Sequence, residues 1–138
     1  MHSVLQPGTW AKPRGYSNGI AARGRNIHVA GQVGWNAQCQ FESDDFALQT
    51  RQALVNILAV LKEANAGPEH IVRMTWYVTS KKEYLAAGKA IGAIYRELMR
   101  MPNGDCSFPA MSAIEVAALM EDRAKVEIEV TAVIPDPD

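Results

Sequence analysis

The sequence predicts a single α+β domain, in which two helices cover one face of a mixed sheet of about five strands. The 138 residues suit one ordinary domain and are enough to bury a sizeable core. Hydrophobic residues make up 48% of the chain and charged residues 21%, which is a globular rather than a disordered composition. Stretches of helical and of strand periodicity follow one another in the order β-β-α-β-α-β-β. With no linker or repeat, we expect residues 1–138 to form one domain.

The N-terminal part is expected to be an irregular arm followed by a β-hairpin. Residues 1–15 contain two prolines and two glycines, which favour irregular structure. Strands are predicted at residues 16–22 and 27–31. Gly24 and Asn26 lie between the two strands and suit the positive backbone angles of a tight turn.

Apolar residues that recur at spacings of three, four and seven predict two helices. The first begins after Asp44 or Asp45, ends at Gly67-Pro68, and presents Phe46, Ala53, Leu54, Ile57, Leu58, Leu61 and Ala64. The second begins after Ser80, with Glu83 placed as in a capping box. Its apolar stripe consists of Tyr84, Gly88, Ile91, Tyr95 and Leu98.

Three more strands are predicted, at residues 72–78, 112–119 and 126–133. Alternation in the last strand turns Val126, Ile128, Val130 and Ala132 toward the helices, and Glu127, Glu129, Thr131 and Val133 away from them. In the strand before it, we assign Ile114 and Val116 to the helix side, and Met111, Ala113 and Glu115 to the other face. That second face mixes apolar residues with carboxylates, so we expect another copy of the chain to cover it.

Several classes of function are disfavoured by the sequence. The chain has 14 Lys and Arg against 15 Asp and Glu, a net charge of −1, which is unlike a strongly basic nucleic-acid module. No apolar run reaches the ~18 residues of a membrane span, and the N-terminus lacks the pattern of a secretory signal. We therefore expect a cytoplasmic protein in which Cys39 and Cys106 are free thiols. The three histidines are scattered and no phosphate loop is present, so we expect neither a metal nor a cofactor.

A few residues remain as candidates for chemistry. Glu115, Glu127 and Glu129 form an expected carboxylate cluster, which would handle protons or, alternatively, form a solvated edge or interface ion pairs. Tyr16 and Trp35 would line an apolar ligand wall or simply pack in the core or an interface. Arg73 is expected on the face away from the helices, where it would pair with a carboxylate.

Five stretches, taken in order, resemble the RidA/YjgF family, whose members are also labelled endoribonuclease L-PSP or translation initiation inhibitors. They cover most of the chain from Tyr16 to Ile134 and read YSNGI (16–20), VAGQV (29–33), QTRQALVNI (49–57), PAMSAIEV (109–116) and VEIEVTA (126–132). The resemblance implies a chorismate-mutase-like fold. It also implies a homotrimer with the sheets packed together, the helices outside, and ligand clefts between the subunits.

The resemblance also implies a reaction. The best-known members hydrolyse reactive imines and enamines, such as 2-aminoacrylate, to a 2-keto acid and ammonia without a metal or an organic cofactor. By analogy, Glu127 orients or activates the water, Tyr16 lines the cleft, and Gly31 and Ala113 offer backbone groups to the substrate.

Two positions depart from the family pattern. Met111 stands where the family has an arginine that clamps the substrate carboxylate, and Ala30 stands where the deaminases carry a serine. Because methionine has no charge and no donor, it cannot bind a carboxylate. We therefore expect a cleft formed by Tyr16, Trp35 and Met111 that takes an imine, enamine or related metabolite other than the usual 2-imino acid. Arg73 is the candidate replacement for the clamp.

Two other functions stay open at this stage. The first is a homotrimer that binds a small ligand, or regulates another process, without chemistry. The second is an endoribonuclease or translation inhibitor, which the chain supports less, since it has no histidine pair and no basic stripe with interleaved aromatic residues.

Overall fold

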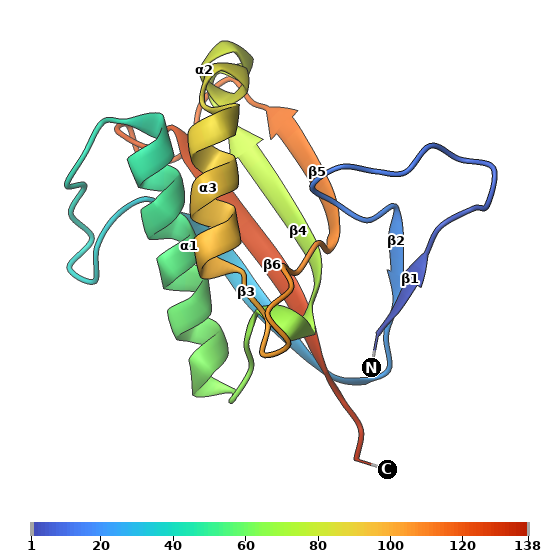
Figure 1. The fold of residues 1–138 in the computed structure, drawn as a ribbon. Helices are drawn as coiled ribbons and strands as arrows, with labels where there is room; N and C mark the ends of the chain where they lie inside the picture. The colour runs from blue at the N-terminus through green and yellow to red at the C-terminus, as the bar shows by residue number, and fades with distance from the viewer. Residues whose placement is uncertain (1, 138) are drawn as a thin grey trace.

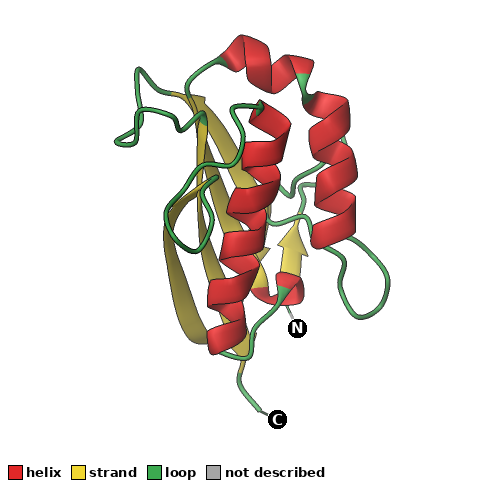
Figure 2. Cartoon of the chain, turned by 90° about the vertical axis from the view of Figure 1, so that its left-hand side faces the viewer, coloured by secondary structure: helices red, strands yellow, loops and turns green. Residues whose placement is uncertain are grey.

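The computed structural model describes residues 2–137 as an α+β fold with helices packed on one face of a sheet (Figures 1 and 2). Its elements are β1 (Ser3–Leu5), β2 (Gly19–Ala21), β3 (Gly24–Val33), α1 (Phe46–Glu63), the 3₁₀ turn η1 (Pro68–His70), β4 (Ile71–Val78), α2 (Lys81–Ala86), α3 (Gly88–Leu98), β5 (Ala110–Glu115) and β6 (Val126–Pro135). The four long strands form a mixed sheet in the order β3-β6-β4-β5. In this sheet β4 and β5 are parallel, and the other pairs are antiparallel. The predicted α+β class and the mixed sheet are confirmed.

The N-terminal strands differ from the prediction. Residues 16–22 and 27–31 do not form a hairpin, because β2 pairs with β1 in a separate two-stranded sheet, while β3 pairs with β6. Gly24 explains the difference. Its φ is +146°, and a Cβ there would lie 1.9 Å from the carbonyl oxygen of Ile134, so this glycine serves a close approach of β3 to β6 rather than a turn. The segment expected to be irregular accordingly contains β1, and the main sheet has four strands rather than five.

The helix boundaries follow the predicted caps. The Asp45 carboxylate accepts a hydrogen bond from the Leu48 N–H at 3.0 Å and begins α1. The Ser80 hydroxyl accepts one from the Glu83 N–H at 3.1 Å and begins α2. The predicted second helix is divided at Ala87 into α2 and α3, and α3 begins at Gly88, a residue of low helix propensity.

The core lies between the helices and the sheet. Leu54, Ile57 and Leu61 of α1 are fully buried against Met74 of β4 and Ile128 of β6. Every second residue of β6 from Val126 to Ala132 is buried, which confirms the face predicted for that strand.

The face predicted for β5 is wrong. The parallel register places Met111 beside Met74 and Ala113 beside Trp76, so both side chains share the helix-packed face of β4. Met111 packs against the core, whereas Ile114 is 47% exposed. Glu115 accepts a hydrogen bond from the Lys81 N–H at the start of α2, at 2.8 Å. It is therefore not part of a cluster with Glu127 and Glu129.

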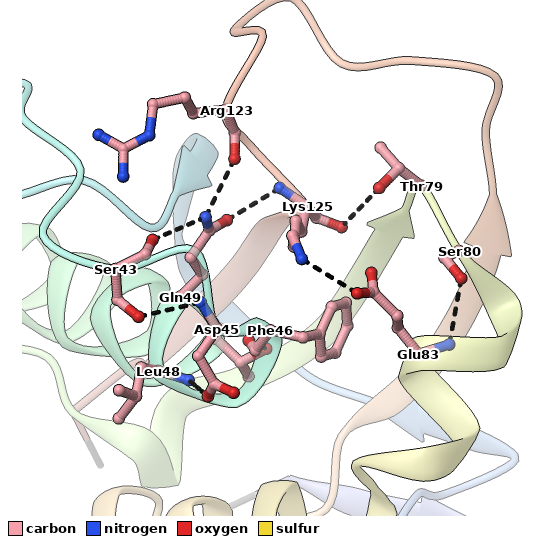
Figure 3. Close-up of polar contacts among 11 residues, drawn as sticks. Ser43, Asp45, Phe46, Leu48, Gln49, Thr79, Ser80, Glu83, Arg123 and Lys125 are labelled. Carbon is pink, nitrogen blue, oxygen red and sulfur yellow. Dashed lines mark hydrogen bonds and ion pairs between the residues drawn. The ribbon is translucent and has the colours of Figure 1, made fainter.

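A buried amide joins α1 to the loop that precedes β6 (Figure 3). The side chain of Gln49 is 1% exposed. Its Nε2 donates to the carbonyl oxygens of Ser43 and Arg123, both at 3.0 Å, and its Oε1 accepts from the Lys125 N–H at 2.8 Å. One side chain thus satisfies three backbone groups from two loops, which fixes where β6 begins relative to α1.

Candidate functional site

A cavity of about 480 Å³ lies between α2 and α3 on one side and β4 and β5 on the other, with the segment before β2 at its mouth. The residues that line it are Arg14, Gly15, Tyr16, Trp76, Tyr84, Leu85, Gly88, Ile91, Gly92, Tyr95, Arg96, Phe108, Met111 and Ala113. Its size is in the range of small-molecule sites.

Five of the fourteen residues that line the cavity are aromatic. Trp76 and Tyr84 meet edge to face with ring centroids 6.2 Å apart, and Tyr95 stacks on Phe108 at 5.8 Å. The Tyr95 hydroxyl donates to the carbonyl of Ser107 at 2.6 Å, and burial raises the pKa of Tyr95, so this phenol stays neutral. The rings present a surface suited to a flat, apolar ligand.

Tyr16 is held at the cavity by its neighbour. The Ser17 N–H donates to the carbonyl of Pro109 at 2.9 Å, and the Ser17 hydroxyl donates to the carbonyl of Phe108. These two bonds attach the N-terminal segment to the start of β5. Tyr16 itself is 41% exposed and forms part of the rim.

A different group of polar residues lies on the sheet face turned away from the helices. The ladder between β3 and β6 is irregular between Val29 and Gln32, so Ala30 and Gly31 lie in a bulge. Gly31 has the Glu127 carboxylate directly above it, since a Cβ there would lie 2.2 Å from Glu127 Oε2. The absence of a side chain at Gly31 therefore makes room for this carboxylate.

A tyrosine on the same sheet face donates a hydrogen bond to a second carboxylate of β6. The Tyr77 hydroxyl donates to Glu129 Oε1 at 2.6 Å. This hydrogen bond raises the pKa of Tyr77, as do partial desolvation and the negative charges of Glu129 and Glu127, while Arg73 opposes the shift. Tyr77 is thus a neutral donor on this face at physiological pH.

The predicted site residues divide between the two faces of the sheet. Tyr16, Met111 and Ala113 line the cavity on the helix side. Ala30, Gly31 and Glu127 lie on the opposite face, where Ala30, Arg73 and Glu129 line a second hollow of about 480 Å³. Arg73 is therefore not beside Met111 within the chain, because Met111 is paired with Met74 and Arg73 with Ala110.

Trp35 belongs to neither group. It contacts Phe41 with ring centroids 5.8 Å apart, and its carbonyl accepts from the Asn56 amide at 2.8 Å. Its place in a loop beside α1 supports the packing alternative given above. Sequence analysis missed most of the cavity lining as a site, including Trp76, Gly88, Gly92 and Arg96. The spacing of Gly88, Gly92 and Arg96 was the available signal, because residues four apart share one face of a helix.

Within residues 2–137, no group of three or more His, Cys, Asp or Glu side chains is arranged to hold a metal ion. None of the helices in that range is both long and apolar enough to cross a bilayer.

Known proteins share this sequence and fold. The Endoribonuclease L-PSP family matches residues 10–134. The chain belongs to the RidA/YjgF family. A RutC family protein of Synechocystis is 31% identical over 135 residues, which cover 96% of each chain. The 2-iminobutanoate/2-iminopropanoate deaminase of Escherichia coli K12 is 32% identical over 110 residues, which cover 80% of each chain.

Solved structures of RidA/YjgF proteins have the same architecture. A Yersinia pestis protein of unknown function from the conserved Rid family superposes with a TM-score of 0.80 at 34% identity, covering 96% of this chain and 98% of that one. The YjgF gene product of Escherichia coli gives a TM-score of 0.65 at 32% identity, covering 86% and 87%. The family membership inferred from the five sequence stretches is confirmed.

Proposed function

We propose that this RidA/YjgF protein is a cofactor-independent hydrolase that adds water to an imine, an enamine or a related reactive metabolite. The observation that carries the proposal is the Glu127 carboxylate, which lies against the backbone of Gly31 with no side chain between them. A carboxylate beside open backbone can hold a water molecule next to a planar substrate. A related protein named as a 2-iminobutanoate/2-iminopropanoate deaminase supports the reaction class.

The reaction needs only proton transfer and positioning. Glu127 accepts a proton from the water as its oxygen forms a bond to the carbon of the protonated imine, and the C=N electron pair moves to nitrogen. The resulting carbinolamine is protonated on nitrogen by the Glu127 carboxylic acid. The C–N bond then breaks, ammonia leaves, and the hydroxyl gives its proton to the Glu127 carboxylate as the carbonyl forms; this proton passes to solvent before the next turnover. Glu127 is the catalytic residue in this scheme.

The proposed site consists of residues from two protomers. Glu127 and the cavity lie on opposite faces of one sheet, so a single chain does not bring them together. A homotrimer with clefts between the subunits would place the carboxylate of one protomer beside the cavity of its partner. Tyr16, Met111 and Ala113 then contact the substrate from one protomer, and Ala30, Gly31 and Glu127 contact it from the other.

The substrate is not the usual 2-imino acid. Met111 packs against the core in the wall of the cavity, and the lining contains two charged residues, Arg14 and Arg96, both of them exposed. An α-carboxylate placed next to the Met111 side chain would lose its hydration without gaining a partner. This leaves the reacting end of the cavity apolar.

Imine hydrolysis by variant proteins tests the function. Imines are generated in situ from several amino acids and amines, and product release is followed by trapping of the carbonyl compound. Glu127→Gln is expected to lose at least about 100-fold in turnover, whereas Glu129→Gln, which removes the same charge from the same strand face, is expected to keep most of it. Full turnover in Glu127→Gln would refute the assignment. Wild type that binds ligand without turnover would favour the ligand-binding trimer.

Co-expression of two inactive variants tests the composite site. Gly88→Leu fills the cavity, and Glu127→Gln removes the carboxylate. If each site uses one protomer for the cavity and its partner for the carboxylate, every mixed trimer contains one intact site. Random mixing of equal amounts then restores about a quarter of the wild-type activity. A site within one chain would give no recovery.

A further inference from the structure

The charge in the cavity has one sign. Arg14 and Arg96 belong to its lining, and no Asp or Glu does. Two other cations near the helices are held in ion pairs. Lys125 pairs with Glu83 at 3.0 Å, and Arg51 pairs with Glu97. Neither Arg14 nor Arg96 has an ion pair or a side-chain hydrogen bond to another residue of the described chain.

Two glycines on α3, Gly88 and Gly92, form the floor of the cavity and lie on the same face of the helix as Arg96. Gly88, Gly92 and Arg96 follow at intervals of four on α3, and all three line the cavity. A Cβ at Gly88 would meet nothing within 4 Å, and one at Gly92 would meet first the Nη1 atom of Arg96, at 3.2 Å. The guanidinium therefore folds back over Gly92 along the side of the helix that faces the cavity.

The opposite wall is aromatic and contains an unused donor. Trp76 is 2% exposed, and its Nε1 is buried without a hydrogen-bond partner in the part of the chain that the structure describes. A buried N–H without an acceptor is uncommon in folded proteins. Tyr84 lies edge-on to the same indole ring.

We propose that the cavity binds a small molecule with a flat apolar body and an anionic group at one end, and that Arg96 binds the anion at the mouth. The body lies on the Gly88–Gly92 floor against Trp76 and Tyr84, and Arg14 adds positive charge across the opening. Because Met111 makes the inner end apolar, the anion is held away from the reacting carbon rather than beside it. The inference deepens the proposed function, and it rests on that function only for the reaction that follows binding.

Calorimetric titration of the full-length protein tests this binding without any chemistry. The probes are 3-phenylpropanoate, its neutral amide 3-phenylpropanamide, and propanoate. Saturable binding of 3-phenylpropanoate is expected, with the amide roughly tenfold weaker, since a charge-assisted hydrogen bond to a partly exposed arginine is worth about that factor. Propanoate, which lacks the ring, is expected not to bind measurably.

Three variants assign the binding to the cavity. Arg96→Gln is expected to weaken 3-phenylpropanoate roughly tenfold and to leave the amide unchanged. Lys89→Gln removes the same charge from the same helix outside the cavity, so it is expected to change neither probe. Gly88→Leu occupies the open space above α3 and is expected to abolish binding of both probes while the thermal midpoint is kept or raised.

The proposal is overturned if wild type binds none of the probes, if the acid and the amide bind equally, or if Lys89→Gln weakens the acid as much as Arg96→Gln does. None of these results bears on the Glu127 assay, which uses imines of several shapes. Conversely, an inactive protein that still binds 3-phenylpropanoate through Arg96 would refute the hydrolase function and keep the ligand class.

Discussion

Two glycines three positions apart in β3 and the loop after it are expected to respond in opposite ways to the same added methyl group. At Gly31, an alanine Cβ would lie 2.2 Å from Oε2 of Glu127, the far end of a flexible side chain. At Gly34, the Cβ would lie 2.6 Å from the Cα, Cβ and carbonyl oxygen of Gln49, which belong to or adjoin the backbone of α1. Neither glycine has a positive φ, so alanine fits the backbone at both positions.

The magnitudes follow from what has to move. In Gly31→Ala the carboxylate must retreat by about 1 Å, and a displacement of that size in a catalytic group costs roughly 100-fold in rate. The stability of Gly31→Ala is expected to change by less than about 1 kcal/mol, because the entropy lost by the unfolded chain offsets the strain. In Gly34→Ala the strand and the helix must separate, which destabilises the fold by roughly 3 kcal/mol. This corresponds to a thermal midpoint lower by about 10 °C.

Thermal unfolding followed by circular dichroism, and imine turnover measured on the same samples, separate the two effects. Gly31→Ala is expected to melt like wild type and to be nearly inactive. Gly34→Ala is expected to melt early and, at a temperature where it is folded, to keep its turnover. Wild-type turnover in a stable Gly31→Ala protein would show that the place of Glu127 over Gly31 has no part in the reaction.

Three further outcomes are expected. Gln49→Leu leaves three backbone groups without their partner and should destabilise the fold by roughly 2 to 4 kcal/mol, measured by urea denaturation. In ultraviolet titration Tyr77 should ionise above pH 10, and Glu129→Ala should bring its pKa down; the stability that the hydrogen bond provides is fully present below pH 10 and is lost as the pH rises through the folded-state pKa. Met111→Arg should lower the thermal midpoint, since no carboxylate lines the cavity to pair with it, and should give turnover of small 2-imino acids that wild type lacks, measured by keto-acid release.

The parts of the fold that the sequence predicts correctly depend on local signals. Asp45 and Ser80 are caps whose side chains bond to the next turn of the same helix. The alternation of β6 is unambiguous because that strand lies in the middle of the sheet, between β3 and β4. Such features need no knowledge of distant parts of the chain.

The errors arise where distant segments decide the outcome. β5 is an edge strand with apolar residues at both parities, so its orientation depends on its register with β4, which pairs Met111 with Met74. β2 and β3 are adjacent in sequence, but Gly24 is adapted to the end of β6 more than a hundred residues later. The residues around Gly24 do not by themselves show that β3 pairs with β6.

The site was predictable only in part, for a related reason. Glu127 and Met111 follow from a resemblance between sequences, but their placement on opposite faces of the sheet requires the register of three strands. The Glu127 carboxylate and the apolar cavity therefore lie on opposite sides of the sheet. In the homotrimer that we propose, a substrate that contacts both lies where the sheet of one protomer meets the cavity of its partner. In the arrangement that we propose, its reacting carbon lies toward Glu127, and Arg96 and Arg14 are the charged residues that line the cavity. If Glu127 and Arg96 act as we propose, Met111 leaves the reacting end of the cavity without an anion-binding group, and the anion of the substrate lies at the mouth beside Arg96.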